Sequence, residues 1–298
     1  MKTIFNSLAL LLITVAVSVA SDKTVIRVGH FPNITHAQGL VAHNLSRQGK
    51  GWFEARLGPG VEIQWFTYNA GPSAMEAIFA KSIELAYVGP GPALNAYAKS
   101  QAEEIRIIAG AANGGAALVV QPDANLKAPA DFKGKKIATP QLGGDAQVLP
   151  AQNPDQLSLF QQQKIDAVWT VEPWVSRLEN EAGGKVLVEE PDAATTVLVS
   201  SVKFLNEKRE LANKFWQAHR ELTDWILRNP EEAQKIVKAE LLAETRSEIS
   251  AELIAHAWKR IIFTSEIPRA SVQAFVANSQ KAGFMKTAPD ISRLFETP

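Results

Sequence analysis

The sequence predicts an α/β protein built as two similar lobes, and three observations support this prediction. Short β-rich runs alternate with helix-like runs from residue 25 onward, which is typical of βαβ units and a mostly parallel sheet. The segment 72–87 is echoed 82 residues later by 154–169, with a proline, a helix-like stretch, an isoleucine plus acid and an aromatic residue in the same order. Turn-rich loops follow three successive strands. Two similar half-units predict two lobes with a cleft between them, and clefts bind small molecules.

The first lobe is expected to contain four strands, each a run in which β-branched and aromatic residues alternate or cluster. These runs are 25–28, 61–66, 85–88 and 105–108. Helices are expected at 37–45, continuing loosely towards Trp52, at 73–81 and at 93–99. Pro72 is placed to open the second of these helices. The glycine- and proline-rich turn 89–92 should close the third strand, and 116–120 should lead out of this lobe.

The second lobe is expected to start at the turn-rich step 129–134. Strands are expected at 136–139, 147–149, 167–170 and 186–188, with a helix at 156–162. The β-rich run 195–200 should return the chain to the first lobe. From Asn206 the chain is expected to be mainly helical, with a break at Pro230. We therefore divide the chain into a leader (1–20), a first lobe (21–118), a truncated second lobe (119–199) and a C-terminal helical region (200–298).

One connection in the second lobe is short. A parallel crossover needs about a dozen or more residues, whereas only 140–145 separate two of the expected strands. We expect the second lobe to lack one βα unit, or the two strands to rearrange as a hairpin through Gly143 and Gly144. Such a loss would weaken binding, change its specificity or destabilise the lobe. Inserting the missing segment should then raise both the affinity and the melting temperature.

The composition and the N-terminal residues limit the possible functions. The formal net charge is zero, so no global field attracts nucleic acid or an acidic membrane. Without cysteine, neither a disulfide framework nor a cysteine-ligated metal is possible. Lys2, the apolar run 8–19 and the small residues 18–20 predict a signal peptide cleaved after Ala20, because the run is short of the roughly 20 residues of a spanning helix. No cysteine follows for lipid attachment, so we expect a freely soluble periplasmic protein.

Candidate binding groups follow the first three strands, where the ligands of open α/β sheets sit. Phe31 offers an apolar wall, Thr35 and Ser73 offer hydroxyl donors, and Gly71 allows close backbone approach. Gly89 starts a third loop of this kind, for which the alternative is a plain turn. Free N–H groups at helix starts favour an anion there. The alternative for the first loop is that Asn33 and Thr35 merely cap a helix.

In the second lobe, Glu172 and Trp174 follow the strand that matches the third strand of the first lobe. Glu172 could accept a hydrogen bond from a ligand amine, and Trp174 could pack against a carbon chain. The alternative is a helix start with an exposed glutamate and a core tryptophan.

Neither catalysis nor a bound metal or cofactor is expected. His30, His36 and His43 are six and seven residues apart, rather than three or four, and no carboxylate lies between them. The sequence contains neither a Gly-x-Ser-x-Gly elbow nor a Walker-type loop. The glycine-rich run 110–115 is expected to precede a strand, so it is not a dinucleotide fingerprint.

Five stretches together resemble one family. They are 28–37, 69–77, 83–90, 131–143 and 165–174. In these the chain resembles the periplasmic substrate-binding proteins of ABC transporters, in the nitrate/sulfonate/taurine class. The resemblance implies a two-lobed, type II clamp that closes as a monomer on one small anion, an aliphatic sulfonate, taurine or a nitrate-like solute. The closed form would dock on an ABC permease in the inner membrane.

The resemblance also implies which residues contact the ligand. These are Phe31, Thr35, Ser73, Gly89 and Asn113 in the first lobe, and Gln141, Glu172 and Trp174 in the second. Backbone and hydroxyl donors at helix starts suit an oxyanion without a positive side chain. Two other functions stay open: a sensor or interaction module with an impaired cleft, and the binding of a thiamine-precursor pyrimidine. An enzyme that handles such pyrimidines is disfavoured by the export signal.

Overall fold

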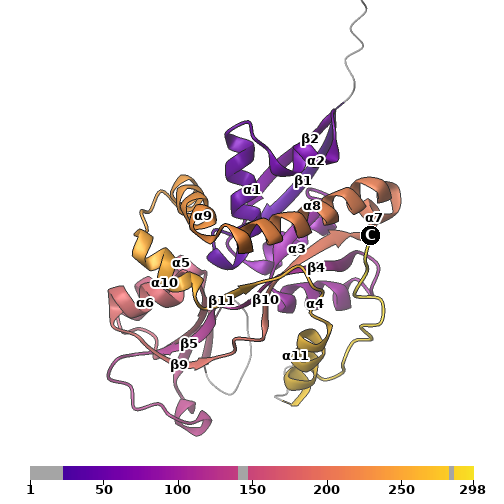
Figure 1. Ribbon diagram of the computed structural model, residues 1–298. Helices are drawn as coiled ribbons and strands as arrows, with labels where there is room; N and C mark the ends of the chain where they lie inside the picture. The colour runs from indigo at the N-terminus through magenta and orange to yellow at the C-terminus, as the bar shows by residue number, and fades with distance from the viewer. Residues whose placement is uncertain (1–22, 140–146, 282–284) are drawn as a thin grey trace, which may run out of the picture.

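The computed structural model describes residues 23–139, 147–281 and 285–298, which form two sheets flanked by helices (Figure 1). The first sheet has six strands in the order β11-β4-β10-β3-β1-β2, and the second has five in the order β7-β6-β8-β5-β9. The predicted leader 1–20, Gln141 and the Gly143-Gly144 junction lie outside the described residues. The two-lobed α/β prediction is confirmed.

The first sheet carries most of the helices. Its strands are β1 (Thr24–His30), β2 (Val61–Thr67), β3 (Leu85–Val88), β4 (Ile105–Gly114), β10 (Ala194–Ser201) and β11 (Ile261–Phe263). The helical elements between its first four strands are η1 (Ile34–His36), α1 (Ala37–Arg47), α2 (Trp52–Leu57), α3 (Gly71–Phe79) and α4 (Pro90–Lys99). After β10 come α7 (Val202–Glu207), α8 (Arg209–Arg228), α9 (Pro230–Thr245), α10 (Ala251–Trp258) and α11 (Arg269–Lys281). All four residues of β3 are buried, as expected for a strand covered on both faces.

The second sheet is smaller. Its strands are β5 (Ala116–Val120), β6 (Lys136–Thr139), β7 (Gln147–Pro150), β8 (Ala167–Val171) and β9 (Lys185–Glu189). They pack with η2 (Pro129–Phe132), α5 (Asn153–Gln161) and α6 (Trp174–Ala182). Strand β5 runs against both of its neighbours, whereas β6, β7 and β8 pair in parallel. In the first sheet β10 and β11 are the reversed strands. Of the neighbouring strand pairs described, two of five are parallel in the first sheet and two of four in the second, so both sheets are mixed and less parallel than expected.

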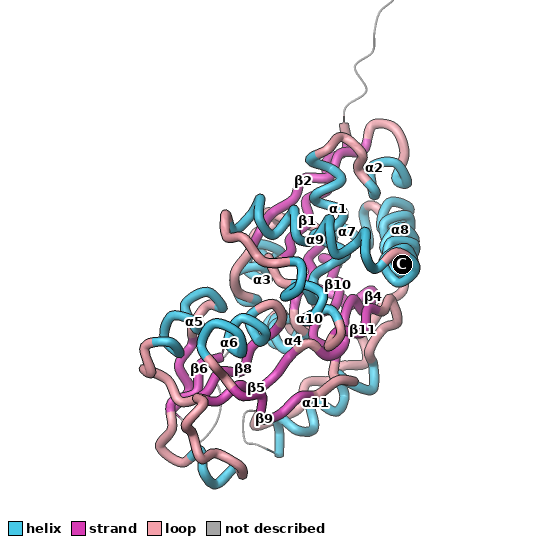
Figure 2. Tube along the Cα trace, turned by 60° about the vertical axis from the view of Figure 1, so that its left-hand side comes forward, coloured by secondary structure: helices cyan, strands magenta, loops and turns pink. Residues whose placement is uncertain are grey.

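The chain crosses between the sheets twice, at neighbouring points. Strand β4 continues into β5 through Gly114 and Gly115, whose φ angles of 66° and 68° lie in the left-handed region. The chain returns from β9 to β10 through residues 190–193, and the Gly114 N–H donates to the Ala193 carbonyl at 2.9 Å. Figure 2 shows the second sheet with α5 and α6 at one end of the molecule and β1, β2 and α8 at the other. The predicted return of 195–200 to the first sheet is confirmed.

The sequence repeat corresponds to a repeated structure. Helices α3 and α5 begin at 71 and 153, each with an early proline, and strands β3 and β8 begin at 85 and 167. Between helix and strand, Lys81 and Gln163 occupy matching left-handed positions, with φ angles of 59° and 53°. The 82-residue offset therefore holds down to single backbone angles.

The acids of the repeat have the same task in both halves. Glu84 accepts the backbone N–H of Arg27 in β1 at 2.7 Å, and Asp166 accepts that of Lys136 in β6 at 2.8 Å. In return the backbone N–H of each acid donates to the carbonyl of the same partner, at 2.9 Å in both cases. Each acid thus fixes the start of its strand against the neighbouring strand.

The two halves differ between their first two strands. Residues 31–60, with η1, α1 and α2, connect β1 to β2, whereas only 140–146 connect β6 to β7. The second sheet therefore has no room for an equivalent helical unit. The hairpin alternative is wrong, because β6 and β7 pair in parallel with Lys136 opposite Gln147.

Two local expectations need correction. Helix α1 ends at Arg47 and does not extend towards Trp52, which instead starts α2 after a turn at Gly49 (φ 69°). Helix α4 begins at Pro90, so the predicted turn 89–92 is mostly the first turn of a helix, where proline is well tolerated. The glycine-rich run 110–115 directly precedes a strand, β5, as expected, and its first five residues also extend β4. The C-terminal region is mainly helical, as expected, and contains one short strand, β11.

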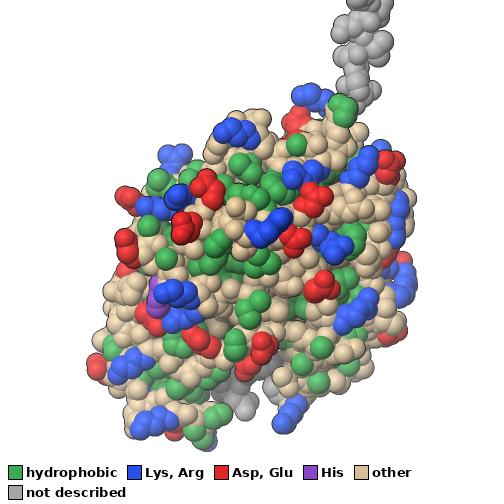
Figure 3. Space-filling model, viewed as in Figure 1, with side chains coloured by type: hydrophobic (Ala, Val, Ile, Leu, Met, Phe, Trp, Pro, Cys, Tyr) green, Lys and Arg blue, Asp and Glu red, His purple; other side chains and the backbone are tan. Residues whose placement is uncertain are grey.

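On the face seen in Figure 3, positive and negative side chains are not separated into large patches. Lys and Arg side chains are interspersed there with Asp and Glu, which agrees with a formal net charge of zero. Among the described residues, no helix is long and apolar enough to cross a membrane.

Candidate ligand-binding site between the two sheets

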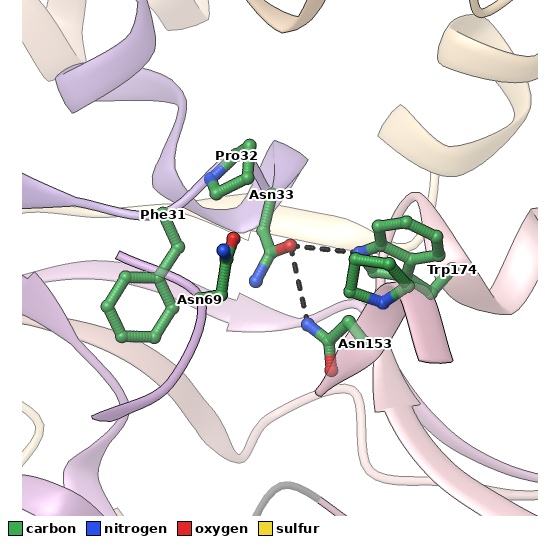
Figure 4. Close-up of a pocket in the computed structure, with 7 residues that line it drawn as sticks. Phe31, Pro32, Asn33, Asn69, Asn153 and Trp174 are labelled. Carbon is green, nitrogen blue, oxygen red and sulfur yellow. Dashed lines mark hydrogen bonds between the residues drawn. The ribbon is translucent and has the colours of Figure 1, made fainter. Parts of the chain in front are cut away.

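A small pocket lies where the loops of the first sheet meet the helix starts of the second (Figure 4). It is lined by Phe31, Pro32, Asn33, Asn69, Asn153, Pro154 and Trp174. The first four come from the loops after β1 and β2, and the last three from the starts of α5 and α6. The space open to the centre of a water molecule is about 10 Å³, which is room for about one water.

Asn33 lies at the centre of this pocket and joins its two sides. Its carboxamide oxygen accepts a hydrogen bond from Trp174 Nε1 at 3.1 Å and a longer one from Asn153 Nδ2 at 3.4 Å (Figure 4). Asn33 directly precedes η1, yet its side chain makes no capping hydrogen bond there. The capping alternative therefore fails for Asn33, whose side chain instead links the two sheets.

The polar groups of the pocket all lie at the starts of helical elements. Asn33 precedes η1, Asn69 precedes α3 by two residues, and Asn153 and Trp174 are the first residues of α5 and α6. Unpaired N–H groups give helix starts a partial positive charge. The seven lining residues carry no ionisable side chain. The pocket thus combines neutral N–H donors with helix starts, an arrangement that favours a small anion.

Two of the residues expected to contact a ligand line the pocket. Phe31 is 7% exposed and stacks on His36, with ring centroids 4.7 Å apart. Trp174 is 6% exposed, and the Arg177 guanidinium lies 4.9 Å from the centroid of its ring. Both aromatic rings are therefore held in place by a neighbour on the same segment.

Four other expected residues do not line it. Thr35 is buried, and its hydroxyl has no hydrogen-bond partner among the described residues. Ser73 is exposed and donates to the Ala70 carbonyl at 2.8 Å. Gly89 precedes α4, and Asn113 is half-buried near the end of β4, where it pairs with β10 and β11. Gln141 lies outside the described residues, so its role, like those of the other four, stays a prediction.

Glu172 contributes to the meeting of the two sheets through its backbone. Its carbonyl accepts from Ile34 N–H at 3.0 Å, and its N–H donates to the Gly115 carbonyl at 2.8 Å. Its carboxylate is fully buried and accepts from the N–H and hydroxyl of Ser176, at 3.1 and 2.9 Å, and from Arg260 at 3.1 Å. Burial raises the pKa of Glu172, and these hydrogen bonds oppose the rise. The expected bond to a ligand amine stays a prediction, because this carboxylate already has three protein donors.

Arg260 fastens the first sheet to three carboxylates of the second. It directly precedes β11, and besides Glu172 it contacts Glu179 of α6 at 2.8 and 3.0 Å and Glu189 of β9 at 2.7 Å. These contacts lie beside the crossing at Gly114, where an added Cβ would approach the Arg260 carbonyl to 2.5 Å. The crossings and the ion pairs together form the joint between the sheets.

Sequence reasoning missed the three asparagines of the pocket as binding groups. Asn33 and Asn69 lie in the candidate loops after β1 and β2. In those loops the hydroxyl groups of Thr35 and Ser73 were the expected donors. Asn153 lies 82 residues after Gly71, so the repeat itself marks it as the start of a helix that faces the cleft. Combining the repeat with the position of each asparagine before a helix would have found them.

A second, larger cavity lies at the opposite end of the strands of the first sheet. Its volume open to the centre of a water molecule is about 140 Å³, and its lining includes Thr24, Arg27, Glu84, Ser201 and Lys203. Thr24 starts β1, Glu84 directly precedes β3, and Ser201 ends the reversed strand β10, so the cavity lies at the amino-terminal ends of β1 and β3. Ligands of open α/β sheets bind beyond the carboxyl ends, so the smaller pocket is the better candidate in spite of its size.

Comparison with known proteins supports the resemblance seen in the sequence. A family model for the NMT1-like family matches residues 135–242, and one for the periplasmic phosphonate-binding proteins of ABC transporters matches 51–152. A putative aliphatic sulfonates-binding protein of Bacillus subtilis is 26% identical over 161 residues, which cover 47% of each chain. The match therefore spans about half the length of that relative.

Solved structures share the fold over nearly the whole chain. The alkanesulfonate-binding protein of Xanthomonas axonopodis pv. citri, bound to MOPS, matches with a TM-score of 0.74 at 15% identity, covering 94% of this chain and 100% of that one. The periplasmic nitrate-binding protein of Synechocystis PCC 6803 matches with a TM-score of 0.71 at 14% identity, covering 90% and 84%. The resemblance to the ABC substrate-binding proteins of the nitrate/sulfonate class is thus confirmed, and the fold is theirs.

Proposed function

We propose that this protein is the periplasmic solute receptor of an ABC importer and binds a small oxyanion between its two lobes. The solute would be an aliphatic sulfonate, taurine or a nitrate-like anion. The closed, loaded monomer would deliver it to an inner-membrane permease. The curated relative is a putative aliphatic sulfonates-binding protein, which favours a receptor on this fold.

One observation carries the proposal: neutral N–H donors and helix starts converge on one pocket. The amides of Asn33, Asn69 and Asn153 and the indole N–H of Trp174 come from both lobes. A cationic side chain is not required, because helix starts and amides already favour negative charge. Phe31 and the Trp174 ring supply the apolar surface that an organic tail of a sulfonate would need.

Binding requires the pocket to open. Its space of about 10 Å³ fits one water, which is less than a sulfonate or nitrate group occupies. Asn33 would exchange its bonds to Trp174 and Asn153 for a new arrangement around the anion. The donors on Trp174 and Asn153 would then be free to bind oxyanion oxygens.

The test is thermal unfolding of the purified protein with taurine, alkanesulfonates, nitrate, bicarbonate and a thiamine-precursor pyrimidine. A ligand at 100 times its Kd adds about 2.7 kcal/mol of stability, so one class of anion should raise the Tm in a dose-dependent way without turnover. Asn33→Asp places a negative charge in the pocket and should weaken anion binding at least about tenfold. Asn229→Asp makes the same change at an exposed helix start and should not.

A second candidate function is favoured by the small pocket and the shortened second lobe. A sensor or interaction module would use the two-lobed shape without carrying a solute. A flat melting response across the whole panel, together with capture of a sensor kinase rather than a permease, would replace the transport proposal with this one.

A further inference from the structure

Two histidines and a glutamate that are distant in the sequence meet inside the first lobe. His30 ends β1, His43 lies in α1, and Glu244 lies in the last turn of α9. His30 Nε2 lies 2.9 Å from His43 Nδ1 and 3.1 Å from Glu244 Oε1, and His43 Nδ1 lies 3.0 Å from that same oxygen. The three atoms therefore form a nearly equilateral triangle, and they can all contact one ion.

With both imidazoles neutral, hydrogen bonding leaves this cluster short of protons. The other ring nitrogen of His30, Nδ1, lies 3.3 Å from the Phe31 carbonyl, which accepts a proton but cannot donate one. With that proton on Nδ1, a neutral His30 directs the lone pair of Nε2 at Glu244 and His43. His43 Nδ1 carries one proton at most, yet it faces His30 Nε2, Glu244 Oε1 and, at 3.1 Å, Glu240 Oε1. The second carboxylate oxygen of Glu244 is buried and has no hydrogen-bond partner among the described residues.

The surroundings fit a cation in the triangle. The side chain of Glu244 is 2% exposed and that of His30 is fully buried, so water does not satisfy these lone pairs. The Glu240 carboxylate, next to the cluster, is held by Arg47 Nε at 2.9 Å and Asn44 Nδ2 at 3.1 Å. It is thus positioned as a fourth ligand or as an outer partner that orients His43, of the kind that tunes metal sites.

The spacing selects the kind of ion. Zinc binds imidazole nitrogen and carboxylate oxygen at about 2.0–2.2 Å, which puts tetrahedral ligand atoms ~3.3 Å apart. The observed separations of 2.9 to 3.1 Å are close to this value, so a small widening seats the ion above the triangle. Two imidazoles disfavour Mg²⁺ and Ca²⁺, which prefer oxygen ligands.

We propose that His30, His43 and Glu244 form a binding site for a zinc-type divalent transition ion inside the first lobe. The ion has a structural role: it joins the end of β1 to α1 and α9. His30 is followed at once by the loop that carries Phe31 and Asn33, so the ion also braces one wall of the pocket between the sheets. The inference does not depend on which solute the protein binds.

Local spacing in the sequence does not reveal this site. The histidines from 30 to 43 are six and seven residues apart, with no carboxylate between them. Glu244 lies 201 residues beyond His43, and α9 brings it there by packing against α1. A ligand from a distant helix leaves no local spacing to recognise.

The experiment is titration of the chelator-stripped full protein with ZnCl₂ and CoCl₂. Wild-type protein should bind one equivalent, gain thermal stability, and give the visible spectrum of a four-coordinate Co²⁺ site, whereas MgCl₂ and CaCl₂ should neither bind nor compete. His43→Gln and Glu244→Gln each remove one ligand and should weaken Zn²⁺ binding at least about 100-fold. The control His256→Gln removes an exposed histidine outside the cluster and should bind as wild type does.

Two outcomes would overturn the site. Wild-type protein that binds no stoichiometric Zn²⁺ would show that the cluster is only a buried network of ion pairs. Binding that is equal in wild type, His43→Gln and Glu244→Gln would show adventitious binding elsewhere. Should a variant fail to fold, NMR of the wild-type imidazoles decides: two of the five histidines, His30 and His43, should shift most on Zn²⁺ addition.

Discussion

At the scale of single residues, buried polar groups with fixed partners explain more of this protein than its exposed charges do. His219 of α8 is fully buried, its Nε2 lies 2.8 Å from the Gly110 carbonyl, and its Nδ1 lies 3.0 Å from the Tyr87 hydroxyl. A carbonyl can only accept, so Nε2 carries the proton and the neutral Nδ1 accepts from Tyr87. Both nitrogens are then satisfied by the neutral ring, whereas a second proton on Nδ1 would force the buried Tyr87 hydroxyl to accept and would leave the proton of that hydroxyl without its partner.

This arrangement predicts a pH dependence of stability. Burial lowers the pKa of His219 from 6.5 to about 4, against the raising effect of the Gly110 hydrogen bond. Between these values only the unfolded chain takes up the proton, so the stabilisation is complete above pH 6.5 and is lost as the pH falls to 4. We expect His219→Gln to remove up to about 1.4 kcal/mol per pH unit from that slope.

Urea unfolding of wild type and His219→Gln from pH 8 to pH 4 measures the effect. The stability difference between the two proteins should be constant above pH 7 and should shrink below pH 6.5. A difference that does not vary with pH would show that His219 is not the titrating group.

At the scale of elements, the repeat shows what the sequence could predict and what it could not. Helix type, strand type and their order followed from hydrophobic pattern and prolines, and the structure confirms them. The ends of helices were missed: α3 and α5 stop at 79 and 161, not at 81 and 162. Just after each of these helices a non-glycine residue, Lys81 or Gln163, has a left-handed backbone conformation. Glycine is the residue that usually takes this position and signals the end of a helix in a sequence.

The sequence predicts only part of the site, because some of its contacts join residues that are distant in the sequence. Its two aromatic members, Phe31 and Trp174, could be named because they lie in motifs with a known pattern. The role of Asn33 depends on Trp174 and Asn153, more than a hundred residues away, and only packing of the two sheets reveals such a partner. The cluster of His30 with Glu244 was missed for the same reason.

The left-handed position also gives a stability prediction. A left-handed conformation costs a non-glycine residue about 1–2 kcal/mol, partly offset in glycine by the entropy of the unfolded chain. Gln163 is exposed and follows the end of α5, so Gln163→Gly should stabilise the protein by about 0.5–1 kcal/mol. Its neighbour Gln162 has a φ of −81°, so Gln162→Gly should destabilise by a similar amount.

Chemical unfolding of the two glycine variants and wild type checks this pair. Opposite signs at adjacent positions are expected, which excludes a general effect of glycine in this turn. Destabilisation by both substitutions would mean that the side chain of Gln163 contributes more than its backbone strain costs.

At the scale of the whole molecule, the relation between the lobes is set by the two crossings and by Arg260. Strands β5 and β10, which follow the two crossings, each pair with a strand on both sides. Because both strands are held in their sheets, a movement of one lobe relative to the other must be absorbed by the few residues between the sheets. Gly114 and Gly115 are the residues of the first crossing, and both have positive φ angles. Binding between the lobes would therefore depend on this joint.

Gly115→Ala tests the joint against a matched control. An added Cβ at Gly115 would approach Ile261 Cγ1 to 2.6 Å and Thr35 Cγ2 to 3.2 Å, whereas at Gly183, which has nearly the same φ (66° against 68°), the nearest atom is 3.9 Å away. Both alanines carry the left-handed strain of about 1–2 kcal/mol, but only the first also displaces its neighbours across the joint. We expect Gly115→Ala to unfold at lower urea than Gly183→Ala, and small-angle scattering to show a more open molecule for Gly115→Ala alone. Equal stability and equal scattering of the two variants would mean that the lobes adjust freely at this crossing, and that the contacts of Arg260 rather than the glycine pair set their closure.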